Sequence, residues 1–426
     1  MLLARRRTEA SIDTLLVAVF SSEEQNIKSE ILGELNELAR TAGYEIVETV
    51  VQNLDYPDPR HYLGKGKVDF ARRTLEAFGA VLIITRHELS PSQAMNLEKL
   101  LGVPVMDRTQ LILKIFGDHA STKEGKLEVE MASLKYQLPR LKGFGRMLSQ
   151  TGAGIGTRGP GEKKLETDRR QAQDRISRLR KDIEEMGRQR EISRKKRLVS
   201  SIPLVSFVGY TNVGKSSLVS EISSEDLLVE NKLFATLDTR VRRARLPAGM
   251  QVLISDTVGF IRELPHELME SFRSTLDEVK YSDLLAVVSD ASDMAVKEKY
   301  EIVDRTLRDI GAGEIKRIHV LNKIDLCTNE RLAELGTIFP EAVMVSALKS
   351  YNIEGILSEI STRLYGKRSR RKLRLKPTEF SSFMRFRGSV EILSENYEKD
   401  LIEVEYVSSD EINKRLISSI CEEGRK

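Results

Sequence analysis

The sequence predicts an α/β protein with a central P-loop domain, whose mostly parallel sheet carries helices on both faces. An α/β domain before it, a helical coiled-coil linker and a small α/β domain after it complete the predicted fold. Three observations support this. Strand and helix signals alternate up to residue 120, two heptad-spaced segments follow, and a glycine-rich phosphate-binding pattern comes after an apolar strand.

A chain of 426 residues is expected to hold several domains. We expect an N-terminal α/β domain over residues 1–120 and a helical hairpin with a glycine-rich loop over 121–200. The P-loop domain is expected over 201–366, and a small α/β domain, joined by a basic segment, over 367–426.

Composition narrows the class of protein. Hydrophobic residues make up 40% of the chain, enough for buried cores, and the net charge of +4 indicates no particular partner. Cys327 and Cys421 lie far apart with no Cys-x-x-Cys spacing, which argues against a disulfide scaffold or zinc site and fits a reducing cytosol. No segment approaches the ~18 apolar residues of a membrane helix. We therefore expect a cytoplasmic protein without a membrane span. A monomer is a separate expectation that composition does not address.

The first 120 residues show a repeating strand and helix pattern. The apolar run LLVAVF near the start is expected to be a buried strand rather than part of a signal peptide. The expected strands are Thr14–Phe20, Tyr44–Val51 and Ala80–Thr85, and the expected helices are Glu24–Ala42, Val68–Phe78, Ser92–Leu101 and Thr109–Phe116.

Two short heptad seams predict an antiparallel coiled-coil hairpin. Its tip is expected in the glycine-rich segment GFGRMLSQTGAGIGTRGPGEKK, and packing of the first helix on the N-terminal domain is an alternative. The match of GIGTRG to a dinucleotide motif is rejected because no strand precedes it. The seams consist of Leu127, Met131, Leu134, Leu138 and Leu141, and of Ala172, Ile176, Leu179, Ile183 and Met186.

Two segments are strongly basic. Residues 162–197 hold 14 Lys or Arg and 8 Asp or Glu, a net of +6 by subtraction, and GKRSRRKLRLK follows at 366–376. Contact with phosphate backbones and a solvated face or charged linker are the two interpretations. Beyond the second segment, GSVEILSEN and LIEVEYVSS read as strands and Asp410–Ile420 as a helix.

The strongest motif is a P-loop after the apolar strand Leu204–Val208. Its backbone N–H groups and the following helix N-terminus can surround phosphates, while Lys215 neutralises the β and γ oxygens and the Ser216 hydroxyl binds Mg²⁺. The residues expected around the phosphates are Gly209, Tyr210, Thr211, Asn212, Val213, Gly214, Lys215, Ser216 and Ser217.

Later motifs predict that the nucleotide is GTP. Asp325, in an Asn-Lys-Ile-Asp sequence after a strand, can accept from guanine N1–H and N2–H₂, a donor pair that adenine lacks. In the DTVG sequence, Asp256 can reach the Mg²⁺ shell and the Gly259 N–H can sense the γ-phosphate. The further expected binding residues are Thr257, Val258, Asn322, Lys323, Ser346, Ala347 and Leu348.

The segment LFATLD is the candidate first switch. Thr236 is expected to place its hydroxyl on Mg²⁺ when GTP is bound, with Thr239 as the alternative. The expected metal ligands are thus Ser216, Thr236 and Asp256, and the expected catalytic residues are Lys215, Thr236 and Gly259. The switch residues expected at the nucleotide are Phe234, Ala235, Thr236, Leu237 and Asp238.

Phe260 occupies the position at which the best-known small GTPases carry a water-orienting Gln. A phenylalanine ring cannot orient water, so hydrolysis is expected to be slow until a partner helps. His266 is an alternative local group, and binding without turnover is the third possibility. Asn212 is a candidate ligand for K⁺ near the β–γ bridge.

The motifs together resemble the HflX-type GTPases, a family of ribosome-associated GTPases. The stretches that carry the resemblance are STKEGKLEVEMASLKYQLPRL, GAGIGTRGPGEKKLETDRR, GYTNVGKSSL, LFATLD and DTVGFIRELPHEL. The resemblance implies binding to the 50S ribosomal subunit and its rRNA, and a role in subunit splitting or rescue under stress. It also implies ATP binding by the N-terminal region, for which only YLGKGKV offers a weak signal. The sequence TRVRRARL after LFATLD departs from the family pattern, so the strand there is expected to differ in detail.

A Mg²⁺-dependent GTPase switch is the function that the sequence predicts. The alternative is a ribosome- or RNA-binding scaffold whose nucleotide serves structure, with negligible turnover.

Overall fold

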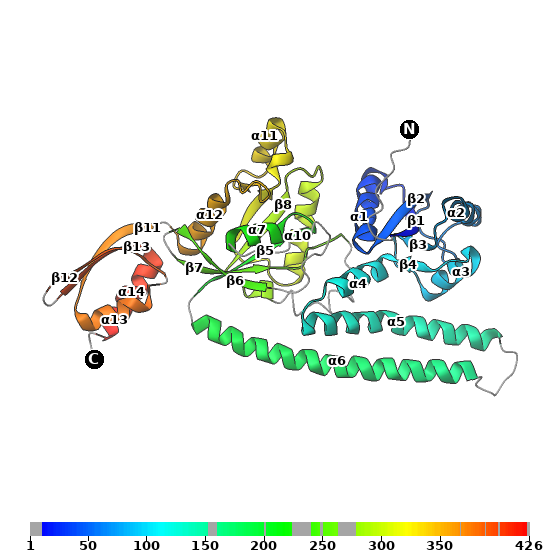
Figure 1. Ribbon diagram of the computed structural model, residues 1–426, viewed down its shortest axis with the longest axis horizontal. Coiled ribbons are helices and arrows are strands. Elements are labelled where there is room, and N and C mark those ends of the chain that lie inside the picture. Colours follow the sequence, from blue (N-terminus) through cyan, green and yellow to red (C-terminus); the bar gives the residue numbers. More distant parts are fainter. Residues whose placement is uncertain are drawn as a thin grey trace. The chain divides into compact units, whose positions relative to one another are not determined.

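The computed structural model describes residues 11–151, 160–199, 202–223, 240–247, 250–262, 278–366, 368–387, 389–398 and 401–423. The described residues group into two compact units, and the division falls inside one long helix, between Arg188 and Gln189. Figure 1 labels the elements of both units. Within the described ranges, no helix combines the length and apolarity needed to cross a bilayer.

The first unit contains a parallel sheet of four strands in the order β2-β1-β3-β4. The helices that connect parallel strands must cross over, and this produces the predicted α/β pattern. The strands are β1 (Ile12–Phe20), β2 (Tyr44–Asn53), β3 (Leu82–Thr85) and β4 (Val105–Asp107), and the helices are η1 (Gln25–Ile27), α1 (Lys28–Thr41), α2 (Lys65–Phe78), α3 (Pro91–Leu101) and α4 (Arg108–His119).

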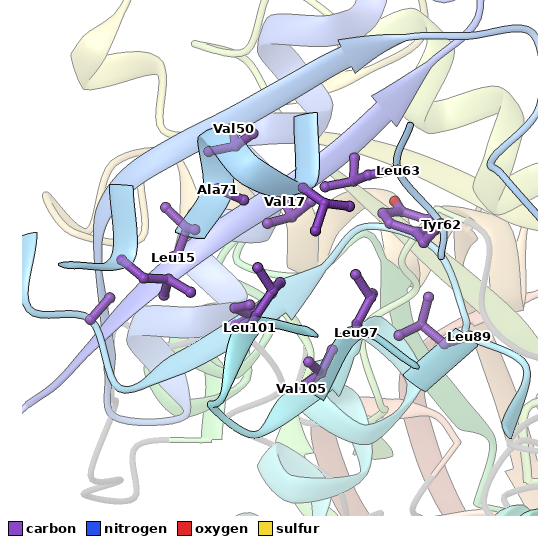
Figure 2. Close-up of a cluster of buried hydrophobic side chains, with 14 of the residues drawn as sticks. Leu15, Val17, Val50, Tyr62, Leu63, Ala71, Leu89, Leu97, Leu101 and Val105 are labelled. Atoms are coloured by element: carbon purple, nitrogen blue, oxygen red, sulfur yellow. The ribbon is translucent and has the colours of Figure 1, made fainter. Parts of the chain in front are cut away.

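Apolar side chains from the sheet, α2 and α3 form the core of this unit (Figure 2). Strand β1 is buried on both faces from Leu15 onward, as its unbroken apolar run predicts. The sequence therefore identified the central strand correctly.

Two long helices follow, α5 (Lys123–Thr151) and α6 (Pro160–Val199). They run antiparallel in Figure 1, and Arg175 of α6 forms a bidentate pair with Glu130 of α5 at 2.6 and 2.8 Å. The predicted glycine-rich loop is too long, because α5 continues through Gly143 and Gly145 to Thr151. The rejected GIGTRG sequence lies in residues outside the described ranges.

The first hairpin helix uses two faces. Val129, Ala132 and Tyr136 are buried in the first unit, where α5 contacts α3 and α4. Leu134 and Leu138 are half-buried, whereas Leu179 on the predicted seam of α6 is fully buried. The packing of α5 on the N-terminal domain, which was the alternative, is therefore observed, and the burial of Leu179 and the Arg175–Glu130 pair agree with a hairpin of α5 and α6.

The second unit contains a six-stranded sheet in the order β10-β9-β8-β5-β7-β6, in which only β6 is antiparallel to its neighbour. The departure at TRVRRARL still forms a strand, β6. The strands are β5 (Leu204–Gly209), β6 (Arg240–Arg245), β7 (Gln251–Asp256), β8 (Leu284–Asp290), β9 (Arg317–Asn322) and β10 (Val343–Met344), and the helices are α7 (Lys215–Ser223), α10 (Val296–Asp309), η3 (Ile324–Leu326), α11 (Asn329–Ile338) and α12 (Ile353–Tyr365).

The last part of the chain forms an antiparallel three-stranded sheet in the order β11-β13-β12. The basic segment is strand β11 rather than a linker, and Arg370 and Arg374 form ion pairs with Glu405 and Glu403 on β13. These pairs lower the net positive charge that the segment offers to a polyanion. The elements are β11 (Arg368–Leu375), α13 (Pro377–Arg385), β12 (Glu391–Glu398), β13 (Leu401–Ser409) and α14 (Asp410–Glu423).

Candidate nucleotide-binding site

The P-loop joins the carboxyl end of β5 to the N-terminus of α7, at an end of the sheet where ligands of open α/β folds bind. Both of its glycines are required by close contacts, one with a backbone carbonyl and one with a side chain. Gly209 has a φ of 154°, and a Cβ there would lie 2.2 Å from the Val288 carbonyl oxygen. Gly214 has a φ of 90°, and a Cβ there would lie 2.3 Å from Asn322 Nδ2. A larger residue at either position would displace the loop.

Lys215 is the first residue of α7 and is almost fully buried. Its Nζ donates to the carbonyl oxygens of Gly209 at 3.2 Å and Tyr210 at 2.8 Å. Burial lowers the pKa of the ammonium to about 8, and the carboxylate of Asp256 opposes that change. The ammonium is held inside the loop, beside the helix N-terminus, where a bound phosphate would supply the negative charge that the two carbonyl oxygens do not.

Asp256 ends strand β7, and its partner in the register is Phe207 of β5. The next residue, Thr257, is buried, and its hydroxyl donates to the Phe207 carbonyl oxygen at 2.7 Å. Thr257 therefore ties the start of the DTVG segment to the strand that leads into the P-loop. Its hydroxyl has a structural role that the motif alone did not indicate.

The residues after Asp256 lie directly on the P-loop. The Phe260 N–H donates to the Gly209 carbonyl oxygen at 3.0 Å, and the Thr211 N–H donates to the Phe260 carbonyl oxygen at 2.8 Å. The Phe260 side chain is only 3% exposed. The ring is thus part of the interior, and its role here is to anchor the segment rather than to meet water.

Asn322, at the end of β9, connects two loops of the site. Its Nδ2 donates to the Val213 carbonyl oxygen at 2.8 Å, and its Oδ1 accepts from the Ala347 N–H at 3.0 Å. The side chain is 2% exposed. The amide therefore joins the phosphate-binding loop to the loop that carries Ser346 and Ala347.

Two side chains orient the predicted base-binding residues. Lys323, with a φ of 64°, pairs with Asp290 through an Nζ–Oδ2 distance of 2.7 Å. The Ser346 hydroxyl donates to Asp325 Oδ1 at 2.5 Å. The sequence analysis did not identify Asp290 as a site residue, although its position at the end of an apolar strand, β8, is a pattern that could have indicated it. Leu348, in contrast, is 80% exposed.

The switch candidates Thr236, Thr239 and His266 lie outside the described residues, as does the whole of Phe234–Asp238. A hydroxyl at Ser216 and a carboxylate at Asp256 are oxygen donors of the kind that Mg²⁺ prefers. In the ranges that the structure describes, no three His, Cys, Asp or Glu side chains gather as a metal cluster. This donor set fits a Mg²⁺ that shares its shell with phosphates and water, rather than one caged by protein.

Three family models match the chain. They are described as GTP-binding GTPase N-terminal over residues 29–117, GTP-binding GTPase Middle Region over 119–197 and 50S ribosome-binding GTPase over 204–323. The GTPase HflX of Caldanaerobacter subterraneus subsp. tengcongensis is 43% identical over 405 residues, which is 94% of this chain and 92% of that protein. The chain belongs to the GTPase HflX family.

Other HflX proteins match over the same length. The GTPase HflX of Escherichia coli K12 is 37% identical over 407 residues, 95% of this chain and 92% of that protein. A solved structure of a GTP-binding protein from Sulfolobus solfataricus in complex with GDP is 25% identical, with a TM-score of 0.45, and covers 83% of this chain and 99% of that one. Family membership and the P-loop domain make this HflX-family chain a GTP-binding GTP hydrolase, which confirms the predicted resemblance, fold class and enzyme class.

Proposed function

We propose that this HflX-family GTPase is a Mg²⁺-dependent switch that cycles on and off the 50S ribosomal subunit and acts in ribosome splitting or rescue. The proposal includes a cytoplasmic monomer with four parts, at residues 1–120, 121–200, 201–366 and 367–426. The match of residues 204–323 to a model described as 50S ribosome-binding GTPase supports the partner. The net charge of +6 over residues 162–197 supports contact with rRNA phosphates.

The joint between the P-loop and the base-binding loop, made by Asn322, is the observation that carries the proposed site. Because Asn322 bonds to both loops, the residues at the phosphates and those at the base are held in fixed positions for one bound nucleotide. Asp325 would accept from guanine N1–H and N2–H₂, with its carboxylate oriented by Ser346. Lys323, held by Asp290, would cover the ring of the base.

At the phosphates, the proposed roles follow from charge and position. Lys215 would neutralise the β and γ oxygens, and the Gly259 N–H would donate to the γ-phosphate. Ser216, Asp256 and, from its place in the sequence, Thr236 would hold Mg²⁺, which supplies further neutralisation of the charge that develops during phosphoryl transfer. Positioning and charge stabilisation carry most of this reaction, so a chain without the Gln can still turn over slowly.

The burial of the Phe260 ring supports the proposal that a partner completes the catalytic site. Because the ring anchors the segment in the interior, it leaves the orientation of water to another group. We propose that the 50S subunit supplies or orders that group. Asn212, with a φ of 59°, is the proposed ligand for K⁺. We also propose, from the family resemblance alone, that the N-terminal domain binds ATP, and we assign no residues to that activity.

Co-sedimentation with purified 50S subunits tests the switch directly. Binding should be strong with a non-hydrolysable GTP analogue and weak with GDP. Equal binding in the two nucleotides would overturn the switch. Binding without any release of phosphate from GTP would favour the alternative of a scaffold with a structural nucleotide.

A further inference from the structure

Tyr210 is joined to the segment that follows DTVG, residues 260–262, by its side chain and also through its neighbours in the P-loop. Its ring is 4% exposed, and its hydroxyl accepts a hydrogen bond from the Arg262 N–H at 2.7 Å. Tyr210 and Phe260 also pair as a parallel bridge, through the two main-chain hydrogen bonds described above. Three hydrogen bonds therefore hold residues 260–262 against residues 209–211.

Gly259 lies next to this attachment and faces the reactive end of the site. A Cβ on Gly259 would lie 2.9 Å from Thr211 Cα and 3.0 Å from Lys215 Nζ. The Gly259 backbone is therefore packed against the lysine that would meet the γ-phosphate. A displacement of residues 260–262 would move the Gly259 N–H relative to that lysine.

The tyrosine ring is itself fixed from another element. Lys299 of α10 places its Nζ 5.1 Å from the centre of the Tyr210 ring, and the same Nζ pairs with Asp293 at 2.5 Å. A cation near an aromatic face is attracted to it, and burial restricts the ring further. Since the ring is held in place, its hydroxyl is a fixed acceptor for the Arg262 N–H.

We propose that Tyr210 is a positioning residue for GTP hydrolysis, whose hydroxyl sets where the Gly259 N–H stands relative to Lys215. This inference rests on the proposed roles of Gly259 and Lys215 at the γ-phosphate, but it does not depend on the ribosomal partner. GDP has no γ-phosphate to receive the Gly259 N–H. The hydroxyl therefore matters for GTP and not for GDP, and this difference separates positioning from a general structural role.

The test is Tyr210→Phe, which keeps the aromatic ring and removes the hydroxyl that accepts from the Arg262 N–H. The measurements are affinities for fluorescent GDP and for a non-hydrolysable GTP analogue, kcat for GTP without ribosomes, and thermal unfolding. We expect about a fivefold loss of kcat and about a fivefold weaker affinity for the analogue, the size of one buried hydrogen bond. GDP affinity should stay within about twofold, and the unfolding midpoint within about 4 °C.

Tyr300→Phe is the matched control, because it removes a hydroxyl from a ring of the same domain that packs on His319 and Phe339. It should leave both affinities and kcat unchanged. Equal losses of GDP and analogue affinity in Tyr210→Phe would show a general role in the P-loop and overturn the proposal. Unchanged kcat and unchanged analogue affinity would overturn it as well.

Discussion

Asn322→Ala tests the joint between the two loops of the nucleotide site. The substitution removes the hydrogen bond to the Val213 carbonyl oxygen and the acceptor for the Ala347 N–H. Each buried hydrogen bond contributes about 1 kcal/mol, and the Val213 carbonyl and the Ala347 N–H, left without a hydrogen-bond partner, cost further free energy if water does not reach them. A total of about 3 kcal/mol is the upper limit of the lost binding free energy, reached when the two loops separate in the free variant and GDP must bring them together again; it corresponds to about 100-fold weaker binding, at roughly 1.4 kcal/mol per tenfold change in affinity.

Isothermal titration calorimetry with GDP measures this loss. Asn396→Ala is the control, because Asn396 lies exposed on β12, far along the chain from the loops of the site. It should bind GDP as the unaltered protein does. If Asn322→Ala bound GDP within about threefold of the unaltered protein, the joint would contribute little and the reasoning would be wrong.

Three further predictions rest on charge. The pKa of Lys215 is lowered to about 8 without ligand, so GDP affinity should fall about tenfold between pH 7 and pH 9 as the ammonium deprotonates. Calorimetry at equal ionic strength measures this change. A GDP affinity that does not vary with pH would contradict a role for the lysine. Asp325→Asn should weaken GTP binding and favour xanthosine triphosphate in a competition assay, and retained preference for GTP would count against the assignment of Asp325. In the N-terminal domain, the hydrogen bond from buried Arg86 holds the pKa of Glu24 at about 2, below its usual 4.5. This stabilisation is complete above about pH 4.5 and is lost as the pH falls toward 2. Glu24→Gln should therefore lower the free energy of unfolding at pH 7 by about 2 kcal/mol. An unchanged denaturation midpoint would contradict the role of this pair.

The sequence predicted the parts of the fold whose periodicity is strong. The unbroken apolar run of β1 and the alternation of strands and helices in the first 120 residues were sufficient, because burial of one face or both leaves a regular pattern. Helix boundaries were less accurate. The glycines at 143 and 145 suggested a loop, yet each costs a helix only about 1 kcal/mol, so α5 can continue through them.

Strand β11 was missed for a different reason. Its alternate positions carry Arg370, Lys372 and Arg374, a pattern that reads as a charged linker when it is seen alone. In the structure, Arg370 and Arg374 pair with Glu405 and Glu403 on the neighbouring strand. The partners come from residues about 30 positions further along the chain, and no local pattern could supply them.

In the nucleotide site too, some residues could be predicted from local sequence and others could not. Motifs place Asn322, Asp325 and the P-loop, because their spacing is fixed by strand ends and a helix N-terminus. They do not show that Asp290 holds Lys323, or that the Tyr210 hydroxyl accepts from Arg262. These contacts depend on how separate segments of the folded domain meet.

Phosphate release from GTP, measured with and without purified 50S subunits, tests the central claim most directly. A GTPase with the Phe260 ring buried and a partner that completes its site should release phosphate slowly alone, faster with 50S subunits, and much less from ATP. A rate that the subunits leave unchanged, or equal hydrolysis of ATP and GTP, would contradict the account.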